Sequence, residues 1–268
     1  MQPLLKFSVD DREFRFALRR LADVTQRDIG DVVRQQARLI AVNLAYQTQP
    51  FGDAAGKANG QSRVRRDIGH VYRGAAYAFK DIEKSSGGSN AAREWWYLVK
   101  NKRMDQAVEV LQRLNLSGYS KDITIGVFDG GMRHQQARTG GRKQVSNRRK
   151  IDFVVTNQGA LSQYLKKIQQ RVGTAKGGWA ACAKLIGGTR GIPGWVSRQT
   201  SRLATGSVAD NTRSTRNPFV SMTNGVPWID KCLNDGQMQR AFDIQKEKML
   251  SYIDRVMRSA GRRAGFRT

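Results

Sequence analysis

The stretch DITIGVFDGGMRHQQARTGGRKQVSNRRKIDFVVTN, residues 122–157, decides the fold expected for this chain. Its two ends, 122–128 and 151–156, are short runs rich in Ile, Val, Thr and Phe, a composition that favours β-strands. A polar segment of about twenty residues separates them, which is long for a loop inside a compact domain. We therefore predict that the two runs pair as an antiparallel hairpin with a long loop at its tip.

The loop of this predicted hairpin, residues 129–150, is rich in positive charge. From residue 130 onward it contains seven cations and no acid, and only Asp129 and Asp152 border it. We expect these cations to contact an anionic surface or a partner outside their own subunit, and a solvated disordered loop is the alternative. The candidate residues are Arg133, Arg138, Arg142, Lys143, Arg148, Arg149 and Lys150.

Outside this stretch the hydrophobic pattern is helical. Apolar residues recur at intervals of three and four over 12–47, 161–186 and 237–260, which predicts long amphipathic helices. The fold class is therefore α+β: long amphipathic helices packed with a small antiparallel sheet that carries the basic hairpin loop. We expect a single domain over residues 1–268 that ends in a basic arm, residues 255–268. Shorter helices are predicted at 62–82 and 93–114.

Residues 172–188, VGTAKGGWAACAKLIGG, look at first like a phosphate-binding loop. Such a loop needs the pattern G-x-x-x-x-G-K-[ST] between a strand and a helix. Here Lys176 precedes the glycine pair, no Ser or Thr follows it, and the preceding run is helical. We therefore predict no nucleotide site, and expect the glycines to allow close approach of another backbone. The helical seam is Leu161, Leu165, Ile168, Val172, Ala175, Trp179, Cys182 and Ile186.

The chain is poor in groups that support catalysis. Its two histidines, His70 and His134, lie 64 residues apart, and no metal-binding motif is present. Asp67 is one helical turn from His70, an arrangement that can orient an imidazole but is more often an ordinary contact. Cys182 lies on an apolar seam, which is typical of a buried free thiol. We therefore expect no enzyme, no cofactor and no metal.

The tryptophans allow two interpretations. Trp95 and Trp96 lie beside several cations in REWWYLVKNKR, residues 93–103, so they can stack nucleic-acid bases. A role in the core or in subunit contacts is the favoured alternative, because adjacent aromatic residues on a helix commonly reach two packing surfaces. Trp179 and Trp195 are candidates for the same packing or assembly role.

The overall charge indicates the kind of partner. The 268 residues include 47 Lys or Arg and 22 Asp or Glu, a formal net charge of +25. Such a surface attracts nucleic acid, acidic protein surfaces or anionic lipid. No apolar run approaches the roughly 18 to 20 residues that span a bilayer, so we expect no membrane anchor. The two cysteines predict reduced thiols and no disulfide framework.

Several segments together resemble neck proteins of tailed bacteriophages, known as head-tail connector or tail-completion proteins. The segments are TQPFG at 48–52, VRRDIGHVY at 64–72, and the pair V-G-x-A-K-x-G-W and I-P-x-W-V within 172–196, followed by an arginine-bearing C-terminal helix. The resemblance implies a structural virion protein with no turnover chemistry, assembled in the host cytoplasm. It implies a homo-oligomeric ring that joins the portal side of the capsid to the tail.

The implied partners are the neighbouring portal or adaptor proteins and tail proteins, together with genomic DNA. The alternative, from the charge alone, is a non-enzymatic nucleic-acid-binding protein that uses the basic loop and tail.

Overall fold

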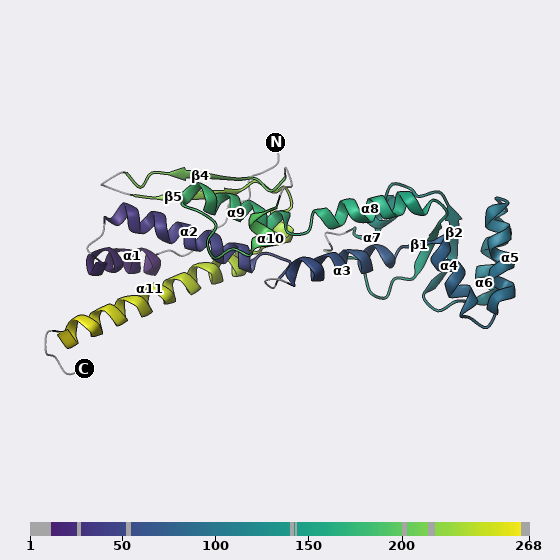
Figure 1. Ribbon diagram of the computed structural model, residues 1–268, viewed down its shortest axis with the longest axis horizontal. Coiled ribbons are helices and arrows are strands. Elements are labelled where there is room, and N and C mark those ends of the chain that lie inside the picture. Colours follow the sequence, from purple (N-terminus) through teal and green to yellow (C-terminus); the bar gives the residue numbers. More distant parts are fainter. Residues whose placement is uncertain are drawn as a thin grey trace. The chain divides into compact units, whose positions relative to one another are not determined.

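The computed structural model describes residues 12–25, 28–51, 55–139, 142, 144–199, 203–213 and 218–263. The protein is a mixed α and β structure whose chain divides into two compact units (Figure 1). One unit, here called the discontinuous unit, consists of Met1–Lys57 and Val172–Thr268, and the other, the inserted unit, is Ala58–Arg171. This division replaces the single continuous domain expected from the sequence.

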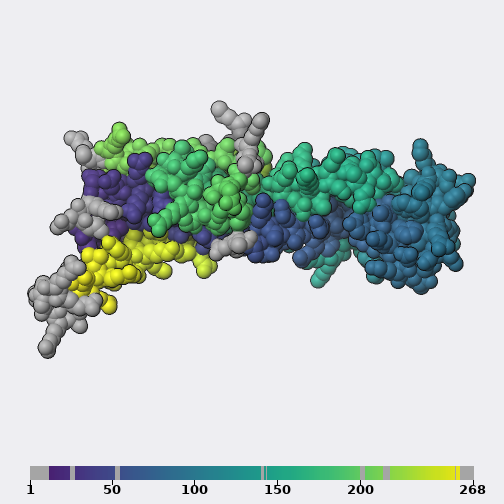
Figure 2. Space-filling model, in the orientation of Figure 1, coloured from purple at the N-terminus to yellow at the C-terminus, as the bar shows by residue number. Residues whose placement is uncertain are grey.

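Helix α2 (Ile29–Gln47) lies at the centre of the discontinuous unit. It packs against α9 (Thr174–Ile186), and it also contacts α1 (Arg12–Thr25) and α11 (Asp235–Arg263), as Figure 1 shows. The apolar faces of these helices form one buried cluster. In Figure 2 the outer side of α11, in yellow, lies open on the molecular surface.

A two-stranded antiparallel hairpin of β4 (Gly206–Asp210) and β5 (Val220–Asn224) covers α9. The contact is close because the facing residues are glycines. A Cβ atom on Gly178 would lie 2.2 Å from Oδ1 of Asn224, and one on Gly206 would lie 2.3 Å from the carbonyl oxygen of Gly178. The glycines predicted to admit another backbone, Gly173, Gly177 and Gly178, instead make room for side chains, because the nearest atoms to an added Cβ belong to Trp195, to Ala204 and Gln199, and to Asn224. Short helices at Gly194–Ser197 (α10) and Ile229–Lys231 (η1) complete the unit.

The inserted unit is built around a parallel sheet with the strand order β1-β3-β2. Side chains of the central strand alternate between two apolar clusters: Phe153 and Val155 face the cluster that includes α3 and α8, and Val154 faces the cluster of α4, α5 and α6. The sheet is thus covered by helices on both faces, as buried parallel sheets require. The strands are β1 (Tyr72–Gly74), β2 (Tyr119–Gly126) and β3 (Ile151–Val155). The helices are α3 (Gly56–Gly69), α4 (Ala75–Glu83), α5 (Gly88–Lys100), α6 (Met104–Leu114), α7 (Met132–Ala137) and α8 (Gln158–Gln170).

The predicted antiparallel hairpin is wrong. The runs at 122–128 and 151–156 do form neighbouring strands of one sheet, but β2 and β3 run parallel. Parallel neighbours need a crossover connection of a dozen residues or more. Residues 129–150, here called the basic segment, contain α7 and provide this connection. The length of this segment is that of a crossover connection and not that of a hairpin loop.

Two of the predicted long helices are each divided in two. The helix predicted at 12–47 is α1 and α2, and Asp28 caps α2 by accepting a hydrogen bond of 2.7 Å from the backbone nitrogen of Gly30. The helix predicted at 161–186 is α8 and α9, separated at Gly173, whose φ is +87°. The apolar spacing therefore continues across a helix break. Residues before the break, such as Leu165, pack in the core of the inserted unit, and residues after it, such as Trp179, pack in the core of the discontinuous unit. The third long helix is confirmed, with bounds Asp235–Arg263.

Candidate anion-binding site

The basic segment is fastened to α3 by one carboxylate. Asp67 Oδ1 accepts a hydrogen bond from the backbone nitrogen of Val145, and Asp67 Oδ2 lies 2.9 Å from Nε2 of His134. Val145 has an exposed fraction of 2% and His134 of 3%, so both contacts are buried. The segment is thus attached at α7 and again at residue 145.

Tyrosine and aspartate side chains extend this attachment. Nδ1 of His134 lies 3.0 Å from the hydroxyl of Tyr164, and the backbone nitrogen of His134 donates to the hydroxyl of Tyr72 over 3.3 Å. Tyr72 in turn donates to Asp129 over 2.5 Å. Burial raises the pKa of Tyr72, and the hydrogen bond to Asp129 raises it further, so the phenol stays protonated. The start of the segment is therefore held by a connected polar network.

Asp67 is negatively charged within this network. Burial raises the pKa of Asp67, but the hydrogen bonds from His134 and Val145, together with the charges of His134 and Arg138, outweigh burial and lower the pKa below its ordinary value. Asp67 therefore contacts His134 from a different element, whereas the sequence suggested His70, one turn away on the same helix. A contact across 67 residues has no local signature.

Three of the seven predicted cations have acidic neighbours inside the unit, contrary to the expectation that all seven need an external partner. Such pairs use part of the positive charge locally and hold the segment in place. The pairs are Arg133 with Asp129 at 3.7 Å, Arg138 with Asp67 at 4.0 Å, and Arg149 with Asp152.

The other predicted cations of the segment face solvent where they are described. Arg142, Arg148 and Lys150 have exposed side chains. Lys143 lies outside the described residues. The positive charge that is available to a partner is thus concentrated near the middle and the end of the segment.

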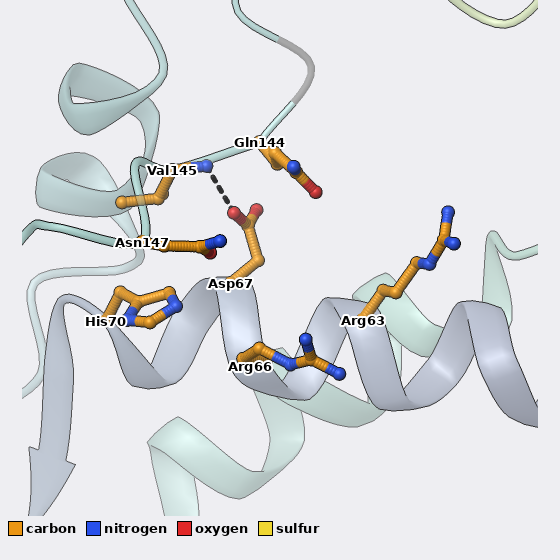
Figure 3. Close-up of a pocket in the computed structure, with 7 residues that line it drawn as sticks. All are labelled: Arg63, Arg66, Asp67, His70, Gln144, Val145 and Asn147. Atoms are coloured by element: carbon orange, nitrogen blue, oxygen red, sulfur yellow. Dashed lines mark hydrogen bonds between the residues drawn. The ribbon is translucent and has the colours of Figure 1, made fainter.

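A cavity of about 250 Å³ lies where the segment crosses α3 (Figure 3). In Figure 3 two arginines project from α3, a histidine lies directly after the end of this helix, and two amide side chains come from the segment. Only one of the lining residues is apolar, which distinguishes this cavity from a site for an apolar ligand. The lining residues are Arg63, Arg66, Asp67, His70, Gln144, Val145 and Asn147.

Arg63 and Arg66 are functional candidates that we did not select from the sequence. They are three residues apart, so they lie on one side of α3. Both have exposed side chains. The sequence RVRRDIGH shows the i, i+3 spacing of these arginines. This spacing alone does not predict a site, because the site also needs the basic segment to cross that side of the helix.

The predicted aromatic residues are not among those that line this cavity. Trp95 is fully buried in the core against α4 and α6, so it cannot stack a base. Trp96 packs edge-on against Phe79, and Nζ of Lys100 lies 5.9 Å from its ring centre. Trp179 is buried in the discontinuous unit, where Trp195 is partly buried against the same core. The packing role of these tryptophans is confirmed, and an assembly role stays a prediction.

The glycine stretch around Lys176 is part of a core. Lys176 has an exposed fraction of 1%, and its Nζ donates to the carbonyl oxygen of Ala45 over 2.6 Å. Gly173 lies against the Trp195 ring, since an added Cβ atom would be 2.3 Å from it. The ammonium group of Lys176 therefore satisfies a backbone carbonyl near the end of α2. Because this group is buried, it is not available to a phosphate chain.

Comparison of the chain with protein-family models, curated proteins and solved structures finds no match. Over the described residues, no three His, Cys, Asp or Glu side chains come together as metal ligands would. None of the helices in the described part of the chain is both long and apolar enough to cross a membrane.

Proposed function

We propose that the protein is a non-catalytic structural protein of a tailed-bacteriophage neck that contacts DNA through its inserted unit. The observation that carries the DNA contact is the charge of that unit. Between residues 58 and 171 there are 22 Lys or Arg and 9 Asp or Glu, a net charge of +13. A polyanion relieves the self-repulsion of such a surface and releases its own counterions on binding.

The positions of the exposed cations support this proposal. Arg63 and Arg66 border the cavity on α3, and Arg142, Arg148 and Lys150 lie on the segment that crosses this helix. A segment fastened by Asp67 keeps these charges together, which lowers the entropy lost when they bind. Within the described part of the chain no ion pair is found for these five cations, and exposed unpaired cations are typical of a phosphate-contacting surface.

The neck assignment is supported by the resemblance of residues 48–52, 64–72 and 172–196 to neck proteins. In that role the chain forms a homo-oligomeric ring in the virion, assembled in the host cytoplasm, beside portal or adaptor proteins and tail proteins. Exposed arginines near the end of α11, Arg255 and Arg258, extend the cationic surface of the discontinuous unit. The alternative is a nucleic-acid-binding protein that forms no ring, which the charge alone favours equally.

Two measurements on the full chain test the proposal. Size-exclusion chromatography with light scattering at 0.1 M and 1 M salt should show an oligomer at both, because ring contacts do not depend mainly on charge. Binding to a labelled duplex of arbitrary sequence should weaken steeply with salt. A monomer that binds duplex would favour the alternative. A protein that binds no duplex at 0.1 M salt would exclude the DNA contact.

A charge-matched pair of variants locates the contact. Replacing Arg142, Arg148 and Lys150 by Ser should lower duplex affinity and reduce the slope of log affinity against log salt by about 3. Replacing three exposed cations of the discontinuous unit, Arg19, Lys184 and Arg240, removes the same charge and should change the slope by less than half as much. Equal effects of the two triple variants would show that only net charge matters.

A further inference from the structure

The cavity between α3 and the basic segment has the composition of an anion site. Arg63 and Arg66 supply two permanent positive charges from one side of the helix. Gln144 and Asn147 add amide groups from the opposite wall, as Figure 3 shows. Guanidinium and amide donors at converging positions are the groups that bind phosphate oxygens.

The one acid in the cavity does not oppose an anion with its full charge. Asp67 uses both oxygens inside the protein, one for the backbone nitrogen of Val145 and one for His134. Arg138 approaches the same carboxylate to 4.0 Å. The negative charge of Asp67 is thus partly balanced by Arg138, and Arg63 and Arg66 place two positive charges in the lining against this one.

His70 lines the same cavity. Its Nε2 atom is shielded from solvent and has no hydrogen-bond partner among the described residues. Because water does not reach this atom, an anion oxygen of similar size does not reach it either. The anion site therefore rests on the two arginines and the two amides.

The cavity has room for a small anion. Its volume is about 250 Å³, and a water molecule occupies roughly 30 Å³. It therefore has room for one tetrahedral oxyanion with some water, and it is open to solvent on one side. A phosphate group of a longer chain enters it from the open side.

We propose that this cavity binds a single phosphate group of a DNA backbone. The identity of the donor rests on the proposed DNA contact, whereas the affinity for phosphate rests on the cavity alone. Binding one phosphate at a fixed place sets the register of the inserted unit along the backbone, without any preference for base sequence.

The test uses the full-length protein and two double variants. Arg63→Gln with Arg66→Gln removes the two cavity cations. Arg65→Gln with Lys121→Gln is the matched control, because it removes two exposed cations of the same unit that do not line the cavity. All four side chains are exposed, so both variants should fold, which circular dichroism checks.

The first probe is inorganic phosphate, compared with chloride at equal ionic strength. Phosphate at 50 mM should raise the unfolding temperature of the wild type and of the control variant, and the rise should be lost in the cavity variant. The second probe is a labelled 20-base-pair duplex at 0.1 M salt. The cavity variant should bind it about tenfold more weakly than the control variant.

The outcomes separate the two proposals. Equal duplex affinity in both variants would overturn the cavity site while the DNA contact stands. No effect of phosphate on the wild type would overturn it as well. A phosphate effect that depends on Arg63 and Arg66, in a protein that binds no duplex, would support the cavity and reject DNA as the donor.

Discussion

The two units of the chain are stabilised by different kinds of buried polar groups. In the discontinuous unit an uncharged amide network lies between α2 and α11: Gln245 donates to Gln36 over 2.6 Å, and Asn43 donates to Gln245 over 3.2 Å. Among the described residues, the ionisable side chains buried there include Lys176 and the Cys182 thiol, and the hydroxyls of Thr48 and Thr174 are buried as well. Most of the other buried side chains of this unit are apolar, so its stability depends mainly on packing.

The inserted unit instead contains ionisable side chains that connect its helices and strands through hydrogen bonds and ion pairs. Asp67 pairs with His134, and Arg73 holds Asp81 through two contacts of 2.6 and 2.7 Å. Tyr119 donates to the same Asp81 over 2.7 Å. Burial, the hydrogen bond and the charge of Asp81 raise the pKa of Tyr119. Because the pKa of Asp67 is lowered, the stability of the inserted unit should fall at acidic pH, whereas the buried amide network of the discontinuous unit does not titrate.

The largest expected effect is the loss of Trp179. Its side chain has an exposed fraction of 5% in the core of the discontinuous unit, so Trp179→Ala should cost about 3–5 kcal/mol. Hydrogen exchange should show lost protection in α2 and α9 and unchanged protection in β3. Trp195→Ala, which removes a partly exposed ring, is the control and should cost less. Equal loss of protection in β3 would show that the two units unfold together.

The next effect is the loss of the Asp67 carboxylate. Asp67→Asn should destabilise the inserted unit by about 2–3 kcal/mol, because His134 loses a charged partner and Val145 keeps only an amide oxygen. The pKa of Asp67 is lowered in the folded state, so its stabilisation is present above the ordinary value of 3.8 and is lost as the pH falls through the lower folded value.

The pH profile is the decisive measurement for Asp67. Unfolding monitored by exchange in β3 should show a stability loss below pH 3.8 in the wild type that is weaker in Asp67→Asn. Glu13→Gln, at an exposed position of α1, is the control and should leave the profile unchanged. Parallel profiles for the wild type and Asp67→Asn would contradict the assignment of acid sensitivity to this pair.

The sequence predicted elements better than their connections. The periodic runs gave α11 correctly, and the β-branched runs gave β2 and β3 as neighbours. The parallel direction of β3 is not predicted, because the third strand of the sheet is β1. This strand has only three residues, and period-2 patterns cannot reveal it. The helix break at Gly173 was missed because the apolar spacing of three and four continues across it.

The candidate site was predicted only in part. The basic segment was found from its charge, but three of its cations are held by local acids. One of these acids, Asp67, lies in a helix more than sixty residues earlier in the chain. Arg63 and Arg66 were missed because exposed arginines are common in this sequence, and only tertiary structure places the segment against them. Pairings of this range follow from topology, and no local pattern encodes them.

A smaller effect is expected from the amide network of the discontinuous unit. Gln245→Leu should cost about 1–2 kcal/mol, because it leaves the buried amides of Gln36 and Asn43 with fewer partners. Replacing all three by Leu should recover part of that loss. Neither variant should alter the dependence of unfolding on pH below 3.8, which contrasts with the Asp67 variant. A change in that dependence would mean that the two units do not differ as described.

The smallest effect concerns reactivity and leaves stability unchanged. Burial raises the pKa of the Cys182 thiol to about 11, and its Sγ lies 3.5 Å from the carbonyl oxygen of Thr223. In a Cys232→Ser background, Cys182 should therefore react with a thiol reagent at pH 8 far more slowly than a free cysteine, since both access and thiolate are scarce. Because reaction then requires opening of the core, adding Trp179→Ala should speed it by at least tenfold, while adding Asp67→Asn should leave it unchanged. Acceleration by Asp67→Asn would show that the core of the discontinuous unit opens when the inserted unit does.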